Sequence, residues 1–271
     1  MTGRMTAEEK EELTAVTEPG RQAGAPGDAV LRALALRARG MSGADIERLV
    51  REARQKARRA RRQLVFSDVF DLLAAARPER SRVLRWCMAV HEAGHAVARL
   101  VLDLGRITSI GIDGPAGGYT QGKTATTETE TEAVFDGLLA VSLAGRAAEE
   151  ELLGCVSAGA GGSPDSDIGK ATTLALAMET ELGFGETWPL LYRHADNQNT
   201  MLVYNPLLAE QINTRLEAAY ARARELIRRN EDAVRFLADA LMRHDTLEGT
   251  ALVAVLTEVR SRMTPEPERK S

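Results

Sequence analysis

The sequence predicts a mainly α-helical protein with one small β element. Of its residues, 44% are hydrophobic but only 4% are aromatic, and Ala, Leu, Arg and Glu are abundant. These four residue types lose little side-chain entropy in a helix, so the composition favours helices. Several long segments also keep their apolar residues on one helical face, whereas the short run RITSIGI at residues 106–112 has the pattern of a strand.

For the first part of the chain, the sequence predicts a flexible lead-in followed by a small helical unit. Residues 1–28 combine Gly, Pro, Thr and charge without sustained periodicity. A helix is then expected with Ser42 as its N-cap and Asp45 three residues later, a variant of the capping box. Its apolar positions share one face: Ile46, Leu49, Val50, Ala53, Ala57, Ala60 and Leu64. A second short helix capped by Ser67 should follow, and a proline ends this unit, which spans residues 29–78.

The second unit, residues 79–262, is expected to open with a helix, a strand and a glycine-rich turn. A helix from about residue 81 to residue 102 leads into the strand at 106–112. A glycine-rich turn is expected at residues 113–120. The Thr- and Glu-rich stretch at residues 124–132 should then be exposed.

Helices are expected to make up the rest of this unit. One should span residues 133–153, and a second should run over residues 167–182 after a glycine-rich loop. A long helix begins at Pro206, since Asn205 is a good N-cap and proline favours the first helical turn. Its apolar stripe is periodic: Ile212, Leu216, Ala219, Tyr220, Ala223 and Ile227. Two shorter helices and a flexible tail at residues 263–271 complete the prediction.

Charge, cysteine content and hydropathy exclude several classes of protein. A net charge of -4 gives no general reason to expect nucleic-acid binding. The two cysteines, Cys87 and Cys155, cannot build a disulfide framework and favour a reducing compartment. No apolar run approaches the roughly 20 residues that span a bilayer. We therefore predict a cytoplasmic chain without a membrane span and without a nucleic-acid partner.

The run RWCMAVHEAGHAVARL contains the pattern His-Glu-x-x-His at His91, Glu92 and His95. On a helix, residues four apart lie on the same face, so both imidazoles can bind one Zn²⁺ ion. Glu92 would then project near the open metal position and take a proton from bound water. The alternative is a pair of helix histidines satisfied by hydrogen bonds. The chain has only four histidines, and the other two, His194 and His244, are expected on the surface.

A hydrolytic zinc site needs a third protein ligand, and the sequence offers two candidates. Glu149 lies on a helix that could pack against the motif helix, but two further glutamates beside it are also typical of a solvated face. Asp167 lies where a glycine-rich loop turns into a helix, but an acid there also complements the helix dipole. Spacing alone leaves both candidates open.

Four separated segments, VHEAGHAV, GGYT, LAGRAAEEELLG and SDIGKATTLA, together resemble the peptidase domain of FtsH-type ATP-dependent zinc metalloproteases. They occur in the same order and at similar intervals. The helical unit before them resembles the lid subdomain of that family's AAA+ module, and the resemblance covers roughly residues 28–248. It implies a zincin-like helical peptidase domain with a small β-strand edge, preceded by a small helical AAA+ lid-like subdomain.

The resemblance also implies roles for individual residues. It places Zn²⁺ on two histidines and an aspartate, His91, His95 and Asp167, and it makes Glu92 the general base. The chain departs from the family by having Ser166 where Asn is usual and by an additional acid, Asp165. The family pattern places Asp167 ahead of Asp165 and Glu149 as the third ligand, which leaves Glu149 as a supporting residue near the site.

The strand at residues 106–112 and the GGYT segment indicate how a substrate could bind. A free strand edge pairs with an extended peptide through backbone hydrogen bonds, which suits unfolded chains. This makes Gly118, Tyr119 and Thr120 the expected substrate-binding residues. The alternative is a strand pair that only closes the sheet.

The functional prediction is a zinc-dependent endopeptidase that cuts unfolded or flexible polypeptides. The family normally carries transmembrane segments and a full ATPase core, and neither occurs in this sequence, which is read as a fragment or as a free-standing protease. Because the family forms hexameric rings, a homo-oligomer is expected, and an ATPase working beside it stays open. The alternative is a non-catalytic or regulatory partner of a full-length protease ring.

A third interpretation comes from residues 117–124, which satisfy the phosphate-loop pattern G-x-x-x-x-G-K-[ST]. That mechanism requires a helix directly after the loop, with backbone amides around a phosphate. The sequence ATTETETE follows instead and would bring three glutamates near the nucleotide's charge. ATP binding at this segment is therefore disfavoured.

Overall fold

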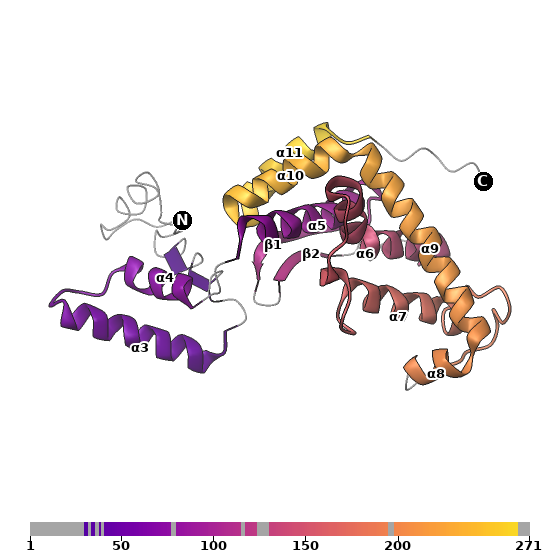
Figure 1. Cartoon of the computed structure of the whole chain (residues 1–271), viewed down its shortest axis with the longest axis horizontal. Helices are drawn as coiled ribbons and strands as arrows, with labels where there is room; N and C mark the ends of the chain where they lie inside the picture. The colour runs from indigo at the N-terminus through magenta and orange to yellow at the C-terminus, as the bar shows by residue number, and fades with distance from the viewer. Residues whose placement is uncertain are drawn as a thin grey trace. The chain divides into compact units, whose positions relative to one another are not determined.

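A computed structural model shows two compact units, Met1–Arg80 and Ser81–Ser271, which are considered separately. The residues that the structure describes are 30, 31, 34, 35, 38, 41–76, 80–114, 117–123, 130–194 and 198–264. The predicted lead-in lies outside them, as do most of the Thr- and Glu-rich stretch and most of the tail. Figure 1 labels the helices and strands in chain order.

The first unit contains two packed helices, α3 (Gly43–Arg59) and α4 (Phe66–Ala75). The predicted capping box at the start of α3 is confirmed, with the Ser42 hydroxyl accepting from the Asp45 N–H and the Asp45 carboxylate accepting from the Ser42 N–H. This pairing satisfies two of the amide groups that a helix start leaves without partners. The buried face of α3 consists of Leu49, Ala53 and Ala57.

The predicted stripe along α3 was too long. The helix ends at Arg59, and Arg61 takes a left-handed backbone conformation with φ 52°, which stops the helical hydrogen bonding. Leu64 therefore lies beyond the helix and is 40% exposed. Ile46, in the first turn, is also exposed.

The predicted cap of α4 was also wrong. The helix begins at Phe66, one residue before Ser67, and its N-cap is Val65, which has no side-chain acceptor. Asp68 supplies the acceptor instead, since its carboxylate takes the Val65 N–H at 3.1 Å. The same carboxylate receives both Arg62 guanidinium nitrogens at 2.6 Å. These bonds hold the turn between α3 and α4.

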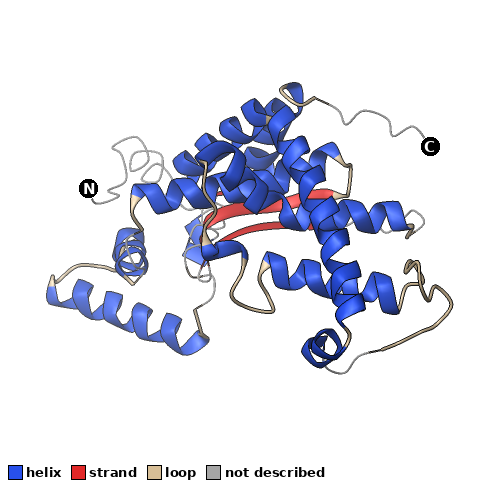
Figure 2. Ribbon diagram, turned by 45° about the vertical axis from the view of Figure 1, so that its right-hand side comes forward, coloured by secondary structure: helices blue, strands red, loops and turns tan. Residues whose placement is uncertain are grey.

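The second unit is a helical domain built around a small sheet (Figure 2). Its elements in chain order are α5 (Arg82–Val101), β1 (Arg106–Gly114), β2 (Gly117–Lys123), α6 (Glu132–Leu153), η1 (Ala158–Ala160), α7 (Asp167–Thr180), α8 (Gln198–Tyr204), α9 (Pro206–Arg229), α10 (Glu231–His244), β3 (Thr246–Glu248) and α11 (Gly249–Ser261). The prediction of a mainly α fold is confirmed, and α5, α6 and α9 begin within one residue of the predicted positions. Asn205 caps α9 as predicted, accepting the Leu208 N–H at 3.2 Å. No helix in the described part of the chain is both long and apolar enough to cross a membrane.

The core of this unit is a close packing of α5 against α6 and α10 (Figure 1). Small residues allow the approach, because Ala93, Ala144 and Ala148 are fully buried between the helices. A Cβ atom added at Gly94 would lie 2.5 Å from the Ala144 carbonyl oxygen and 2.6 Å from the Ala148 Cβ. The sequence of α5 therefore brings one turn of its backbone directly against α6, at the level of the His-Glu-x-x-His pattern.

The three strands form an antiparallel sheet in the order β2-β1-β3. This corrects two predictions. β1 is the central strand and not a free edge, since β3 pairs with its other side. The segment predicted as a turn up to residue 120 is instead largely strand β2, which starts at Gly117, where φ is 128° and glycine is favoured. Among the described residues, β2 is paired on one side only, with β1.

Candidate metal site

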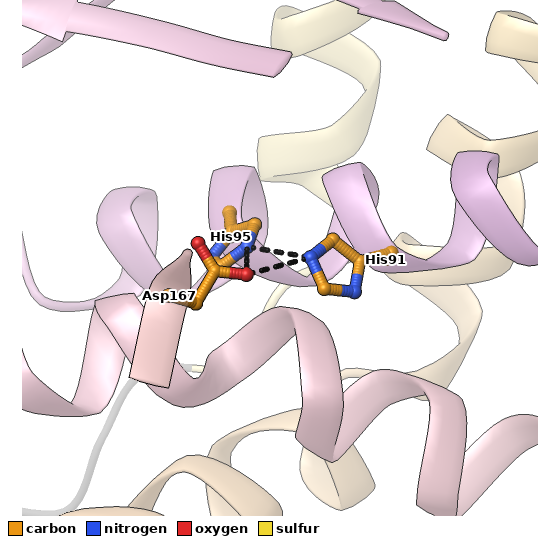
Figure 3. Close-up of side chains that lie close together, drawn as sticks. All are labelled: His91, His95 and Asp167. Atoms are coloured by element: carbon orange, nitrogen blue, oxygen red, sulfur yellow. Dashed lines mark hydrogen bonds and ion pairs between the residues drawn. The ribbon is translucent and has the colours of Figure 1, made fainter. Parts of the chain in front are cut away.

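Two helices bring three potential ligand atoms together (Figure 3). His91 and His95 lie one turn apart on α5, and Asp167 is the first residue of α7. Asp167 Oδ2 lies 2.9 Å from His91 Nε2 and 3.2 Å from His95 Nε2, and the two Nε2 atoms are 3.1 Å apart. No other set of three or more His, Cys, Asp or Glu side chains converges in this way within the described ranges.

The second nitrogen of each ring is held by an oxygen atom. His95 Nδ1 lies 2.8 Å from the Val141 carbonyl oxygen, which can only accept, so Nδ1 carries the proton and donates it. His91 Nδ1 lies 2.8 Å from Glu149 Oε1 in the same manner. Holding Nδ1 in this way directs the Nε2 lone pair of each ring toward the shared point, which is the usual arrangement of metal-binding histidines.

The electrostatics of this pocket favour a positive charge. Burial lowers the pKa of His91, but its hydrogen bonds with Asp167 and Glu149 outweigh burial and raise that pKa to about 10. Burial alone would raise the pKa of Asp167, but its hydrogen bonds with both histidines have the larger effect and hold that pKa below its ordinary value. The carboxylates of Asp167 and Glu149 therefore favour a positive charge at His91, and a cation bound at the shared point would supply one.

The donor set fits a zinc ion. Zinc prefers imidazole nitrogen and carboxylate oxygen at roughly 2.0–2.2 Å, and two ligands at tetrahedral corners are then about 3.3 Å apart. The three donor-to-donor distances of 2.9, 3.1 and 3.2 Å are close to that separation. Catalytic zinc sites commonly have three protein ligands and one further position.

The position of Asp167 follows from the local sequence. Ser166 is the N-cap of α7, and its hydroxyl accepts the Gly169 N–H at 3.2 Å. A Cβ atom at Gly169 would lie 2.5 Å from the Pro164 carbonyl oxygen, so the loop turns tightly into the helix only with glycine there. Asp165, the neighbouring acid, is exposed and is not part of the converging group.

Glu149 is a buried partner of His91 and not a member of the donor group. Its side chain is 3% exposed, so the alternative of a solvated helix face is wrong for this residue. Ser157 donates its hydroxyl to Oε1 at 2.9 Å and its backbone N–H to Oε2. Although burial raises the pKa of Glu149, the hydrogen bonds from His91 and Ser157 lower it overall, so the group stays ionised.

Glu92 lies beside the donor group, between α5 and β2. It is 6% exposed, and burial raises the pKa of its carboxyl group. The Thr120 hydroxyl lies 2.8 Å from Oε2 and 3.1 Å from the Glu92 carbonyl oxygen. Gly118 also adjoins Glu92, since a Cβ atom added at Gly118 would lie 2.4 Å from Glu92 Oε1.

The structure thus brings most of the predicted site residues into one place. His91, His95, Asp167 and Glu92 adjoin one another, and Gly118 and Thr120 contact Glu92. Tyr119 does not face the site, because its ring lies over Gly111 on the other face of β2. The other two histidines are exposed, as predicted.

Two contributors to the site were missed by sequence reasoning. The Val141 carbonyl is a backbone group, and no side-chain pattern reports it. Gly145 lies under both rings, since an added Cβ atom would be 2.5 Å from His95 Nε2 and 2.6 Å from His91 Nε2. In the sequence, only the small residues of the LAGRAA run indicated that α6 could pass so close to the two histidines of α5.

The phosphate-loop interpretation is wrong for the residues that the structure describes. Residues 117–123 form strand β2 in an antiparallel pair with β1. A phosphate-binding loop needs consecutive backbone amides pointing into one concavity, and a strand directs them alternately to its two sides.

Comparison with known proteins agrees with this geometry. A sequence model of peptidase family M41 matches residues 80–255, and a model of the AAA+ lid domain matches residues 28–71. The chain is 32% identical over 266 residues to the ATP-dependent zinc metalloprotease FtsH 1 of Sphaerobacter thermophilus, covering 87% of this chain and 39% of that protein.

Two further relatives carry the name ATP-dependent zinc metalloprotease FtsH. The protein of Acidothermus cellulolyticus is 34% identical over 265 residues, which cover 89% of this chain and 39% of that protein. The protein of Bacillus subtilis is 29% identical over 250 residues, which cover 80% of this chain and 38% of that protein. The chain spans about two fifths of the length of these relatives. With its peptidase segment matched over residues 80–255, the chain belongs to peptidase family M41.

Proposed function

We propose that this chain is a zinc-dependent endopeptidase that hydrolyses peptide bonds in unfolded or flexible polypeptides. The observation that carries the proposal is the convergence of His91 Nε2, His95 Nε2 and Asp167 Oδ2 beside the buried Glu92 carboxylate. The relatives' names, which specify zinc metalloproteases, support it. A zinc ion bound there would polarise the scissile carbonyl group and lower the pKa of a bound water molecule towards about 7.

Each residue of the site has a distinct task in this proposal. His91, His95 and Asp167 hold the metal, and Glu149 and the Val141 carbonyl fix the two imidazole rings. Glu92 acts as the general base, taking the proton of the attacking water and passing it to the leaving amine. Burial raises the pKa of Glu92 above its ordinary value, which makes its carboxylate a stronger base.

The outer edge of β2 is the proposed substrate-binding site. β1 is paired on both sides, whereas the described part of β2 is paired only with β1. An extended polypeptide could add to β2 through backbone hydrogen bonds along Gly118, Tyr119 and Thr120. Recognition through the backbone makes few demands on sequence, which suits unfolded substrates.

Assembly and partners follow from the same family relationship. We propose a homo-oligomer, with six copies as the expected number, and an ATPase as the partner that would deliver folded substrates. The AAA+ lid match and the relatives' printed name, ATP-dependent, support this proposal. The exposed apolar side chains Trp188, Leu190 and Tyr204 are the residues at which we propose contact between copies. A cytoplasmic setting is part of the proposal, supported by a cysteine content too low for a disulfide framework.

The test combines metal analysis with casein cleavage by wild type and Glu92→Gln. We expect about one zinc ion per chain in both proteins and a loss of at least about 100-fold in cleavage rate for the variant. Glu210→Gln, at an exposed position on α9, is the matched control and should cleave normally. A chain that holds no metal and shows equal inertness in all three proteins would contradict the proposal. The regulatory alternative would be favoured if the chain co-purifies with an ATPase and the activity of that complex is unaffected by Glu92→Gln in this chain.

A further inference from the structure

The Glu92 side chain is enclosed between its own helix and the edge strand β2. Only 6% of Glu92 is exposed, and the nearest groups of β2 are Gly118 and Thr120. Sequence reasoning assigned both residues to substrate binding. Their contacts in the structure are instead with the side chain that is proposed to act as the base.

The alternation of β2 explains how the strand reaches Glu92. In a strand, residues two apart face the same side, so Gly118 and Thr120 share one face and Tyr119 takes the other. The ring of Tyr119 covers Gly111, where an added Cβ atom would lie 2.7 Å from the ring. Tyr119 thus anchors β2 on β1, and the opposite face is turned towards α5.

Gly118 and Thr120 constrain different parts of the carboxylate. An added Cβ atom at Gly118 would lie 2.4 Å from Glu92 Oε1 and 2.9 Å from its Cδ, so the carboxylate rests directly on the strand backbone. The Thr120 hydroxyl lies 2.8 Å from Oε2. The strand therefore contacts both carboxylate oxygens, Oε1 through Gly118 and Oε2 through the Thr120 hydroxyl, which also lies 3.1 Å from the Glu92 carbonyl oxygen.

We propose that Thr120 is a positioning residue for Glu92, holding its carboxylate against Gly118 in the orientation that proton transfer requires. The inference rests on the proposed role of Glu92 as general base. A glutamate has three rotatable side-chain bonds, and a base must lie within hydrogen-bond reach of its proton. Displacement of a catalytic group by about 1 Å lowers a rate by up to about 100-fold. β2 would therefore orient the base with the Thr120 side chain and the Gly118 backbone, and bind substrate with the backbone groups of its outer edge.

Three threonine variants test the inference. Thr120→Val keeps the side-chain shape and removes the hydroxyl, whereas Thr120→Ser keeps the hydroxyl. Thr108→Val is the matched control, because the Thr108 hydroxyl is exposed on β1 and donates to the Gln121 carbonyl oxygen, away from Glu92. For cleavage of an unstructured peptide we expect Thr120→Val to lower kcat about tenfold to 100-fold, with KM and zinc content within about twofold of wild type. Thr120→Ser should recover most of the rate, and Thr108→Val should match wild type.

A second measurement does not depend on turnover. A peptide hydroxamate binds zinc and gives its proton to a neighbouring carboxylate, so its affinity reports whether Glu92 is in place. In calorimetry on the zinc-loaded proteins, Thr120→Val should bind this probe about tenfold more weakly and Thr120→Ser as tightly as wild type. If Thr120→Val keeps the wild-type affinity and kcat, the inference is overturned. It is also overturned if Thr120→Val and Thr120→Ser lose affinity and kcat equally, because packing alone would then explain the effect.

The two measurements also separate this inference from the proposed function. If wild type binds zinc and the hydroxamate but cleaves no peptide, the proposed function fails, and the affinities of the two Thr120 variants still decide the role of the hydroxyl. If zinc-loaded wild type binds no hydroxamate, both proposals are overturned.

Discussion

Among single residues, Glu149 has the most specific structural role outside the donor group. It accepts from His91 Nδ1 at 2.8 Å and is itself fixed by the hydroxyl and the N–H of Ser157. A buried carboxylate in this position sets the tautomer of the imidazole and increases its basicity as a ligand. The proposed affinity of the site for metal should therefore depend on Glu149, although Glu149 is not one of the three converging donors.

We predict that Glu149→Ala lowers zinc affinity by about 10- to 100-fold, because the His91 ring loses the group that orients it. Competition with a zinc-binding dye measures this change. Glu150→Ala is the control, since Glu150 bonds to Tyr220 on α9 and does not contact His91. Unchanged zinc affinity in Glu149→Ala would show that the hydrogen bond has no role in metal binding.

The side chains of the site could largely be predicted from the sequence, whereas the backbone groups around them could not. Helical spacing alone brings His91 and His95 to one face of the helix, and Glu92 directly follows His91 in the chain. Asp167 is 72 residues from His95, and only the family pattern selected it over Glu149. The Val141 carbonyl and the close passage of Gly145 depend on how α6 crosses α5, and tertiary packing of that kind leaves no local signal.

At the level of helices and strands, two of the three predicted N-caps are confirmed and the third, Ser67, is wrong. Ser42 and Asn205 cap α3 and α9 as predicted, since a cap needs only residues within one turn. Predictions were incorrect for β2, which has glycines at 117, 118 and 122 and becomes a strand by pairing with β1. The short strand β3 and helix α8 were not predicted, because neither is long enough to show a periodic pattern.

The α3–α4 pair depends on one ion pair that also caps a helix. Asp68 is 3% exposed, accepts two hydrogen bonds from Arg62 and one from the Val65 N–H, and has its pKa lowered to about 2, chiefly by Arg62. A lowered pKa in the folded state means that ionised Asp68 stabilises the fold above its ordinary pKa near 4. This stabilisation is lost as the pH falls from about 4 to about 2.

We predict that Asp68→Asn speeds amide hydrogen exchange in α4 at neutral pH. The loss of a charge-assisted bond and part of a helix cap should lower the local free energy of opening by about 1–3 kcal/mol. Exchange measured by mass spectrometry should show the difference from wild type closing between about pH 4 and pH 2. Asp71→Asn, at an exposed position of the same helix, is the control and should exchange like wild type. A difference that persists at pH 2 would exclude the charge of Asp68 as the cause.

For the molecule as a whole, exposed apolar side chains between α7 and α9 are relevant to assembly. Leu190 is 99% exposed, Tyr204 82% and Trp188 55%. Large apolar side chains gathered along one segment are typical of surfaces that another protein covers. This segment is the first place to look for contact between copies of the chain.

We predict that the double variant Leu190→Glu and Tyr204→Glu lowers the oligomer mass measured by light scattering or sedimentation. Two buried like charges at a contact oppose association by several kcal/mol. Val253→Glu, at a 54% exposed position on α11, is the control and should leave the mass unchanged. If wild type is monomeric, or if the double variant keeps the wild-type mass, this surface does not carry the assembly.

The proposed metal donors would have a consequence for folding as well as for chemistry. His91 and Asp167 are 76 residues apart in the chain, so an ion held by both closes a long loop. A cross-link of that span removes conformational freedom from the unfolded chain, worth at most about 4–5 kcal/mol by chain entropy. We predict that a chelator lowers the melting temperature of wild type and leaves Asp167→Asn unaffected, as calorimetry would show. If the chelator lowers the melting temperature of both proteins equally, the ion stabilises the fold without joining His91 to Asp167. In the predicted case the bound ion would join the start of α7 to α5, and its removal would loosen that connection as well as abolish the proposed cleavage.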